Sequence, residues 1–214
     1  MTGDLFGASA QLAITDDPAK TRALSQWHTP RKLAHRVVRD LVGGWARGRH
    51  IVEPSAGGGV FVDELLEVIG EFGRVTAVEL DPAWAARLRA RYAHEPRVTV
   101  VEADYLTTRI ECDLVAGNPP YEDGLDTAFM AHALDTAGRF AFVVQTRAMH
   151  CQDRYARVWS RAARRNLAFC VRRPSFGGGS AKGDFCAVKA SLMGSDEPNI
   201  HPTIEDWADD WSEL

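Results

Sequence analysis

The chain has 214 residues, of which 45% are hydrophobic and 25% are charged, as in an ordinary globular protein with one medium-sized domain. We expect neither a membrane span nor a secretory signal, because no long apolar run and no basic start with an apolar stretch is present. The four cysteines form no CxxC pair, which argues against a zinc site or a disulfide framework. We therefore expect a reduced, cytoplasmic protein with no metal.

The charge is unevenly distributed along the chain. Residues 193–214 contain seven acidic residues and no Lys or Arg, and without them the net charge would change from −4 to +3. Between residues 139 and 183, ten basic residues stand against one acid, Asp153. This pattern predicts a basic face on the body of the protein and an acidic C-terminal tail. A partner protein is a candidate to bind the tail.

Strand-like and helix-like segments alternate along the chain. The predicted strands are 51–55, 74–81, 98–104, 112–117, 139–147, 167–173 and 184–192. The predicted helices are 30–42, 60–72, 82–95, 126–137 and 153–166. Such alternation indicates an α/β fold with a Rossmann-like, doubly wound, mostly parallel seven-stranded sheet that ends in an antiparallel β-hairpin. We divide the chain into a flexible N-terminal segment (1–26), a single domain (27–192) and the acidic tail (193–214).

The turn after the first predicted strand reads Glu-Pro-Ser-Ala-Gly-Gly-Gly at residues 53–59. Small residues let a ligand approach the backbone, and the helix that follows offers free N–H groups. A dinucleotide-binding turn would need G-x-G-x-x-G, but Val62 occupies the position of the last glycine. Glu53 would also repel a pyrophosphate, so this turn favours a cationic ligand.

Two further acids end the next two predicted strands. Glu79 follows Gly59 by 20 residues, the usual distance for an acid that binds two ribose hydroxyls. Asp104 ends the third strand, where it would accept a hydrogen bond from an adenine amino group. Each acid alone is as well explained as a solvated strand end. Together with Glu53 they fit S-adenosylmethionine, which carries an α-amino group, a ribose, an adenine and a sulfonium.

Several motifs resemble those of class I S-adenosylmethionine-dependent methyltransferases, and among these the N6-adenine DNA methyltransferases. EPSAGGGVF, VELD and EADYL resemble the cofactor motifs, and NPPY at 118–121 resembles the catalytic motif. WHTPRKLAHRVV resembles the segment that closes over the methionine part of the cofactor, and RRPSFGGGSAKGDFCAV resembles a late hairpin of small phage and mobile-element members. The resemblance covers residues 27–190 and implies methyl transfer to adenine N6 in DNA.

These motifs predict the residues that bind S-adenosylmethionine. The predicted cofactor-binding residues are Thr29, Pro30, Glu53, Ser55, Ala56, Gly57, Gly59, Phe61, Glu79, Leu80, Asp104, Tyr105 and Asn118. The predicted catalytic residues are Asn118, Pro119, Pro120 and Tyr121. Oxygens of Asn118 and Pro119 would accept the hydrogens of the target amino group, and Tyr121 would offer a face on which a flipped-out base stacks.

The nature of the substrate is open at this stage. NPPY also occurs in methyltransferases of RNA adenine and of protein glutamine, and a non-catalytic nucleic-acid-binding protein with a methyltransferase fold is a third alternative. The predicted nucleic-acid-binding residues are Arg154, Arg157, Arg161, Arg164, Arg172, Arg173, Phe176 and Lys182, the first four on one face of the helix at 153–166. A solvated basic helix would give the same pattern. Trp207 and Trp211 hint at a short amphipathic docking helix in the tail.

Overall fold

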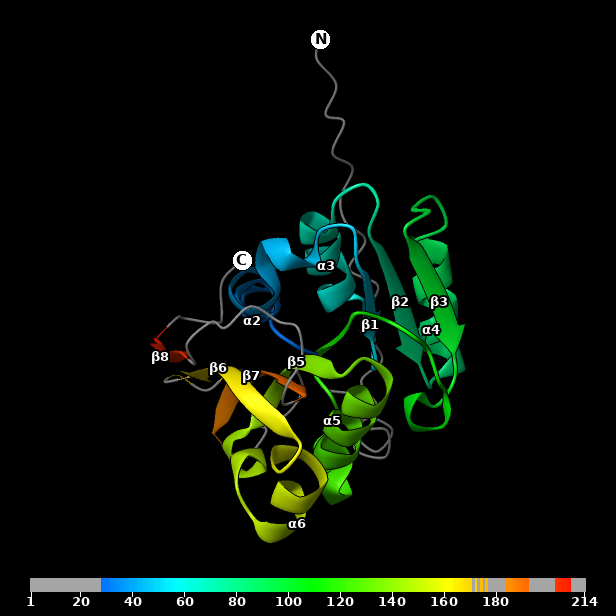
Figure 1. Ribbon diagram of the computed structural model, residues 1–214. Helices are drawn as coiled ribbons and strands as arrows, with labels where there is room; N and C mark the ends of the chain where they lie inside the picture. Colours follow the sequence, from blue (N-terminus) through cyan, green and yellow to red (C-terminus); the bar gives the residue numbers. More distant parts are fainter. Residues whose placement is uncertain are drawn as a thin grey trace.

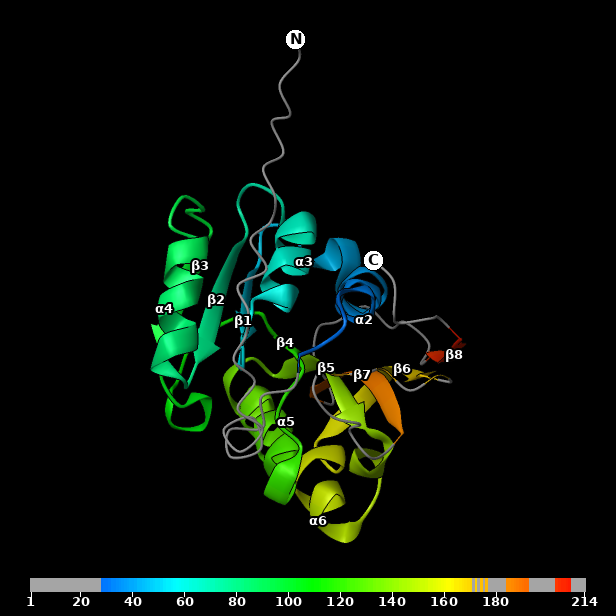
Figure 2. The same ribbon diagram turned by 180° about the vertical axis from the view of Figure 1, so that it is seen from behind.

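The computed structural model describes residues 28–170, 172, 174, 176, 184–192 and 203–208, with only the backbone at 164 and 165. These residues form one sheet covered by helices on both faces (Figures 1 and 2). The strands are β1 (His50–Glu53), β2 (Arg74–Glu79), β3 (Val98–Glu102), β4 (Leu114–Gly117), β5 (Arg139–Gln145), β6 (Ala162–Cys170), β7 (Phe185–Leu192) and β8 (Thr203–Trp207). The α-helices are α2 (Arg31–Arg36), α3 (Val60–Ile69), α4 (Pro82–Arg91), α5 (Leu125–Thr136) and α6 (Gln152–Arg154). The π and 3-10 turns are η1 (Val37–Val42), η2 (Gly43–Ala46), η3 (Tyr105–Thr107), η4 (Glu122–Gly124), η5 (Thr146–Met149) and η6 (Tyr155–Trp159).

The sheet has the strand order β3-β2-β1-β4-β5-β7-β6-β8. The pairs from β3 through to β5 are parallel, and β7 lies antiparallel between β5 and β6. The chain runs outward from β1 to β3 and then returns to the other side of β1 with β4, so the strand order reverses between β1 and β4. The predicted Rossmann-like fold with its antiparallel β6–β7 hairpin is confirmed, and the switch point lies where ligands bind in such sheets.

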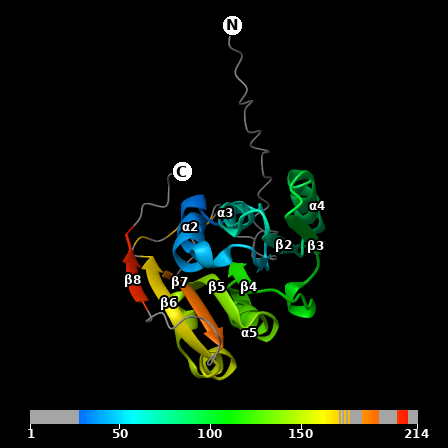
Figure 3. The same cartoon turned by 45° about the horizontal axis from the view of Figure 1, so that its top comes forward.

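Two groups of helices cover the two faces of the sheet (Figure 3). The α2–η1 segment, α3 and α4 pack on one face, through buried residues such as Leu33, Leu65 and Leu88. The α5 helix and η6 pack on the other face, through residues such as Met130 and Trp159. Within the part of the chain that the structure covers, no helix has the length and apolarity to cross a membrane.

The predicted helix at 153–166 is wrong in its second half. The helical turns α6 and η6 end at Trp159, whose indole N–H donates to the carbonyl of Ala148 at 2.9 Å. The chain then enters β6 at Ala162, because this segment pairs with β7 along most of that strand's length. Sheet pairing thus overrides the helical spacing of the arginines. Arg154 and Arg157 lie in the helical turns, Arg161 lies in the turn that follows, and Arg164 lies on β6.

The C-terminal segment contributes an eighth strand. Residues Thr203–Trp207 form β8, which pairs in parallel with β6 at the edge of the sheet (Figure 1). Trp207 is buried, and the guanidinium of Arg36 lies 4.8 Å from the centre of its ring. The predicted docking helix is therefore wrong at Trp207, because the segment forms a strand that is hydrogen-bonded to β6. Trp211 lies outside the described residues.

Candidate active site

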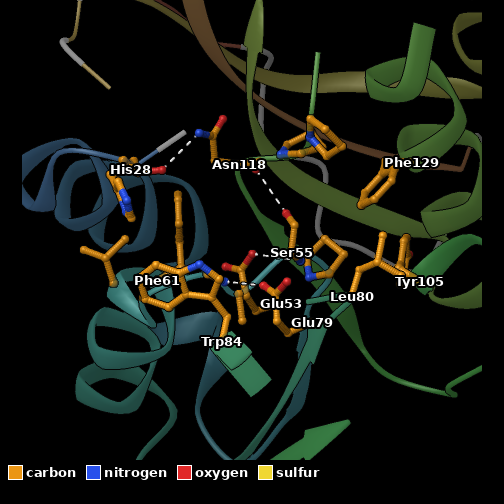
Figure 4. Close-up of a pocket in the computed structure, with 18 of the residues that line it drawn as sticks. His28, Glu53, Ser55, Phe61, Glu79, Leu80, Trp84, Tyr105, Asn118 and Phe129 are labelled. Atoms are coloured by element: carbon orange, nitrogen blue, oxygen red, sulfur yellow. Dashed lines mark hydrogen bonds between the residues drawn. The ribbon is translucent and has the colours of Figure 1, made fainter. Parts of the chain in front are cut away.

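A pocket of ≈ 500 Å³ lies beyond the carboxyl ends of β1, β2 and β4, at the switch point of the sheet (Figure 4). It is lined by nearly all of the predicted cofactor-binding residues and by both prolines of NPPY. These residues are Thr29, Glu53, Ser55, Ala56, Gly57, Phe61, Glu79, Leu80, Asp104, Tyr105, Asn118, Pro119 and Pro120. The fold thus brings the separate sequence motifs into one cavity.

Glu53, the last residue of β1, is almost fully buried, with 1% of its surface exposed. Its Oε1 accepts a hydrogen bond from the backbone N–H of Ser55 at 3.4 Å, whereas its Oε2 has no partner. Burial, together with the nearby Glu79 carboxylate, raises the pKa of Glu53 well above its usual range. An unpartnered carboxylate oxygen on the wall of a pocket fits a ligand ammonium group, which would supply the missing charge and donors.

Glu79, the last residue of β2, is held by the backbone on both sides. The N–H of Gly57 donates to its Oε2 at 2.7 Å, and the N–H of Asp81 donates to its Oε1 at 2.8 Å. Burial raises the pKa of this carboxyl group, and the backbone donors partly oppose that shift. Because each carboxylate oxygen keeps a further acceptor position, this rigid group suits the two hydroxyls of a ribose.

The far end of the pocket combines an acid with an apolar wall. Asp104 lies two residues beyond the end of β3, where its Oδ1 accepts the N–H of Leu106 at 2.9 Å. Leu80 lines the pocket, and its apolar side chain is 58% exposed. The rings of Tyr105 and Phe129 pack with their centres 5.1 Å apart and line the same wall. A flat apolar slot with one acceptor fits an adenine ring and its amino group.

Two predicted cofactor residues lie outside the lining. Pro30 starts α2, where its carbonyl accepts the N–H groups of Leu33 and Ala34. Gly59 has a positive φ of 87°, and a Cβ there would lie 2.5 Å from the hydroxyl of Tyr92. The absence of a side chain at Gly59 therefore makes room for Tyr92, and the cofactor contacts of Pro30 and Gly59 stay predictions.

Asn118 begins the NPPY motif directly after β4 and is held at three points. Its carbonyl oxygen accepts the hydroxyl of Ser55 at 3.1 Å, and its Nδ2 donates to the hydroxyl of Thr29 at 3.0 Å. Its Oδ1 accepts the hydroxyl of Tyr121. Figure 4 shows Asn118 across the pocket from the carboxyl groups of Glu53 and Glu79. Thr29, predicted as a cofactor residue, thus also contacts the catalytic motif.

Tyr121 does not lie where the predicted stacking role needs it. Its side chain is 3% exposed and does not line the pocket. The ring packs instead against Phe185 and Phe176, with centres 5.4 and 6.3 Å away. Phe176 is itself completely buried. Neither the ring of Tyr121 nor that of Phe176 is open to a base in this arrangement, so their contact with a base stays a prediction that needs the rings to move.

Comparison with known proteins places this chain in a family. The model of the ribosomal RNA adenine dimethylase family matches residues 25–165, which is more than half of the chain. The chain belongs to the ribosomal RNA adenine dimethylase family. It is 34% identical over 123 residues to the ribosomal RNA small subunit methyltransferase A of Bordetella pertussis, a match that covers 56% of this chain and 43% of that protein. Across the curated relatives it matches, the chain spans less than half of their length.

Solved structures with different names share this fold. The 23S rRNA methyltransferase ErmE superposes with a TM-score of 0.59 at 22% identity, over 79% of this chain and 70% of that one. The methyltransferase subunit of a type I restriction-modification system from Streptococcus thermophilus superposes with a TM-score of 0.66 at 13% identity, over 84% of this chain and 47% of that one. Both likenesses concern the fold alone, which is shared by enzymes with different substrates.

Membership of the adenine dimethylase family confirms the predicted class I methyltransferase fold and its cofactor, S-adenosylmethionine. The comparisons do not support DNA as the first choice of substrate. The family model and the curated relatives are named for ribosomal RNA.

The predicted nucleic-acid contacts are only partly available. Arg154 is 17% exposed and lies 3.7 Å from the fully buried Asp126, so it holds the structure together. Arg157 and Arg161 are more exposed and pair with exposed acids, Asp153 at 3.6 Å and Asp135 at 2.5 Å. Arg172 is exposed. The side chain of Arg164 and the residues Arg173 and Lys182 lie outside the described part of the chain.

Sequence reasoning missed several residues of the pocket wall. Trp84, on α4, lines the pocket, and its indole meets the ring of His28 edge-on with centres 5.6 Å apart. Leu125 and Phe129, on α5 directly after NPPY, line the opposite wall. Trp84 carries no motif that would mark it. The position of α5 immediately after the catalytic motif was the one available signal for Leu125 and Phe129.

Proposed function

We propose that this chain transfers methyl groups from S-adenosylmethionine to the N6 amino group of an adenine in RNA, with ribosomal RNA as the first substrate to test. The observation that carries the proposal is one cavity with the unpartnered carboxylate oxygen of Glu53 at one wall and Asn118 at the other. The first fits the amino group of the cofactor, and the second fits the amino group of a base.

S-adenosylmethionine, when bound, supplies an electrophilic methyl group on a positively charged sulfur. The amino group of adenine is a weak nucleophile, because its lone pair is delocalised into the ring. Acceptors at the Oδ1 of Asn118 and the carbonyl of Pro119 would bind its hydrogens, direct the lone pair forward and stabilise the positive charge that develops. No general base is needed before transfer, because the product loses its proton readily. The rest of the catalysis is positioning.

RNA is preferred to DNA because of the family to which the chain belongs. DNA remains the second candidate because the four residues of NPPY resemble the catalytic motif of N6-adenine DNA methyltransferases. A flipped or unpaired adenine would present the same amino group to Asn118 in either polymer. The pocket recognises the nucleobase and leaves the choice of polymer to surfaces outside it.

The test is a transfer assay with labelled S-adenosylmethionine and parallel substrates. These are ribosomal RNA, small ribosomal subunits, single-stranded DNA, duplex DNA and a protein extract. The products are digested to nucleosides or amino acids and identified by mass spectrometry. We expect N6-methyladenosine or N6,N6-dimethyladenosine from RNA. Label only in deoxyadenosine or in protein would overturn RNA as the substrate, and no label in any arm would overturn the function.

A further inference from the structure

We propose that Arg31 binds the carboxylate in the amino-acid part of S-adenosylmethionine. This inference rests on the cofactor site of the proposed function and does not depend on which polymer is methylated. It starts from the charges of the cofactor. The α-amino group fits Glu53, but the carboxylate on the same carbon needs hydrogen-bond donors and a positive charge of its own. The pocket therefore needs a cation near Glu53, unless water alone solvates this carboxylate.

The amino-acid end of the pocket lies at the start of α2. Figure 4 shows Glu53 between two ends of the pocket, with Tyr105 and Phe129 at one end and His28 at the other. Because the slot for the adenine ring is at the first end, the amino-acid part of an extended cofactor points toward the second. Arg31 is the first residue of α2, follows His28 by three positions and lines the pocket.

Two of the described residues that line the pocket carry a guanidinium group, Arg31 and Arg91. Both terminal nitrogens of Arg91 bind the protein, since Nη1 donates to the carbonyl of Gly58 at 2.9 Å and Nη2 contacts the carboxylate of Asp63. Arg31 instead uses its Nε, which donates to Oε1 of Glu64 at 2.8 Å. Its two terminal nitrogens donate no hydrogen bond to another described residue, so they are available to a ligand.

The guanidinium of Arg31 is held by a buried carboxylate. Glu64 lies on α3, and only 4% of its side chain is exposed, whereas 64% of the Arg31 side chain is exposed. The other oxygen of Glu64 lies 2.8 Å from Nδ1 of His35, one turn further along α2. A guanidinium is planar, so contact through Nε leaves open the edge that carries Nη1 and Nη2. This edge matches the two oxygens of a carboxylate.

The test compares two ligands that differ only in the carboxylate. S-adenosylhomocysteine has this group, and decarboxylated S-adenosylhomocysteine lacks it but keeps the amino group that fits Glu53. Calorimetry measures both affinities. We expect the wild-type protein to bind S-adenosylhomocysteine roughly tenfold more tightly, at the low end for a hydrogen bond to a charged group because Arg31 is exposed. Equal affinities in the wild-type protein would overturn the inference without any variant.

Three variants then assign the preference to one side chain. Arg31→Gln should weaken S-adenosylhomocysteine alone and bring the two affinities within about twofold of each other. Arg31→Lys keeps the charge but loses the planar fork, so we expect it to restore part of the preference. Lys32→Gln is the matched control, because it removes a positive charge from the next residue of α2, which does not line the pocket. It should keep the preference of the wild-type protein.

The outcomes separate binding from a structural role. An equal loss of both ligands in Arg31→Gln would show that Arg31 only holds α2 against α3, and would overturn the inference. Loss of the preference in Lys32→Gln would also overturn it, since overall charge would then be the cause. If Arg31→Gln did not fold, the wild-type comparison and Arg31→Lys would still decide. Failure of the wild-type chain to methylate any substrate appears in the transfer assay and would overturn the proposed function instead, so the two failures are distinguishable.

Discussion

The carboxyl group of Glu53 lies against the bare α-carbon of Gly117, on the neighbouring strand. A Cβ at Gly117 would lie 2.2 Å from Oε1 of Glu53, far closer than such atoms can approach. The two residues end β1 and β4, the pair of strands between which the sheet order reverses. Gly117 thus leaves the space in which the buried carboxyl group is held at the pocket wall.

We predict that Gly117→Ala displaces this carboxyl group. The added methyl group should cost about 1–3 kcal/mol of stability, the usual range for overpacking a core. It should also weaken the binding of S-adenosylhomocysteine, which calorimetry measures directly. Gly44→Ala is the matched control, because a Cβ there meets nothing within 4 Å. Equal cofactor affinity in Gly117→Ala and wild type would contradict this account of the strand pair.

A second prediction concerns pH and Glu53. Burial raises the pKa of this carboxyl group above its ordinary value of 4.5, so the free protein keeps it neutral over part of the range above that value. The neutral form is favoured by folding, and its contribution to the stability of the free chain is lost as pH rises from 4.5 through the raised pKa. A bound ammonium group favours the charged form, so cofactor binding should release a proton and strengthen as pH rises.

Calorimetry in buffers with different heats of ionisation would count the released proton. Glu53→Gln should abolish the release and weaken binding roughly tenfold to a hundredfold, since a hydrogen bond to a charged group contributes about 1.5–3 kcal/mol. If the affinity of the wild-type protein for the cofactor did not change with pH, the predicted contact between Glu53 and the cofactor's amino group would be contradicted.

A third prediction separates Arg154 from the other arginines. Arg154→Leu would leave the charge of the fully buried Asp126 without its cation, which typically costs about 3–5 kcal/mol. Arg157→Leu breaks an exposed pair with Asp153 and should cost about 0–1 kcal/mol. Urea unfolding of the two variants gives the comparison. Similar losses in both would show that Arg154 is an ordinary surface residue.

A fourth prediction concerns contacts with the RNA backbone. Arg157→Gln and Arg161→Gln should each weaken RNA binding and make the plot of log affinity against log salt shallower by about 0.7, the slope for one phosphate contact on a single strand. Arg89→Gln is a matched control, because Arg89 is similarly exposed and pairs with Glu102 on the α4 side of the molecule. Binding curves at several salt concentrations decide this, and identical slopes for all three variants would remove these arginines from the interface.

The sequence predicted those parts of the site that depend on local order along the chain. Glu53 and Glu79 end buried strands and Asn118 directly follows one, and a parallel sheet brings such positions to one edge whatever the rest of the chain does. The direction of a side chain is a different matter. The position of Tyr121 depends on Phe176 and Phe185, which lie more than fifty residues further along the chain.

The same distinction explains the errors in the fold. The arginines between residues 154 and 164 have helical spacing, but pairing with β7 begins at Ala162 and overrides it. Trp207 is also four residues from Trp211, yet the segment that it ends forms a strand beside β6. Gly59 appeared to make room for a ligand, and the structure shows that it makes room for Tyr92. In each case a contact with a residue distant in the chain determined the structure, which the spacing of nearby residues alone did not predict.

The central claim is that Asn118 receives the adenine amino group in the pocket that binds S-adenosylmethionine. The most direct test is single-turnover methyl transfer to ribosomal RNA by Asn118→Ala, with S-adenosylhomocysteine affinity measured on the same preparation. We predict that transfer falls by at least roughly a hundredfold, as on removal of a group that stabilises charge in the transition state, and that this loss is much larger than any loss of cofactor affinity. Transfer at the wild-type rate would contradict the assignment of Asn118 and the mechanism built on it.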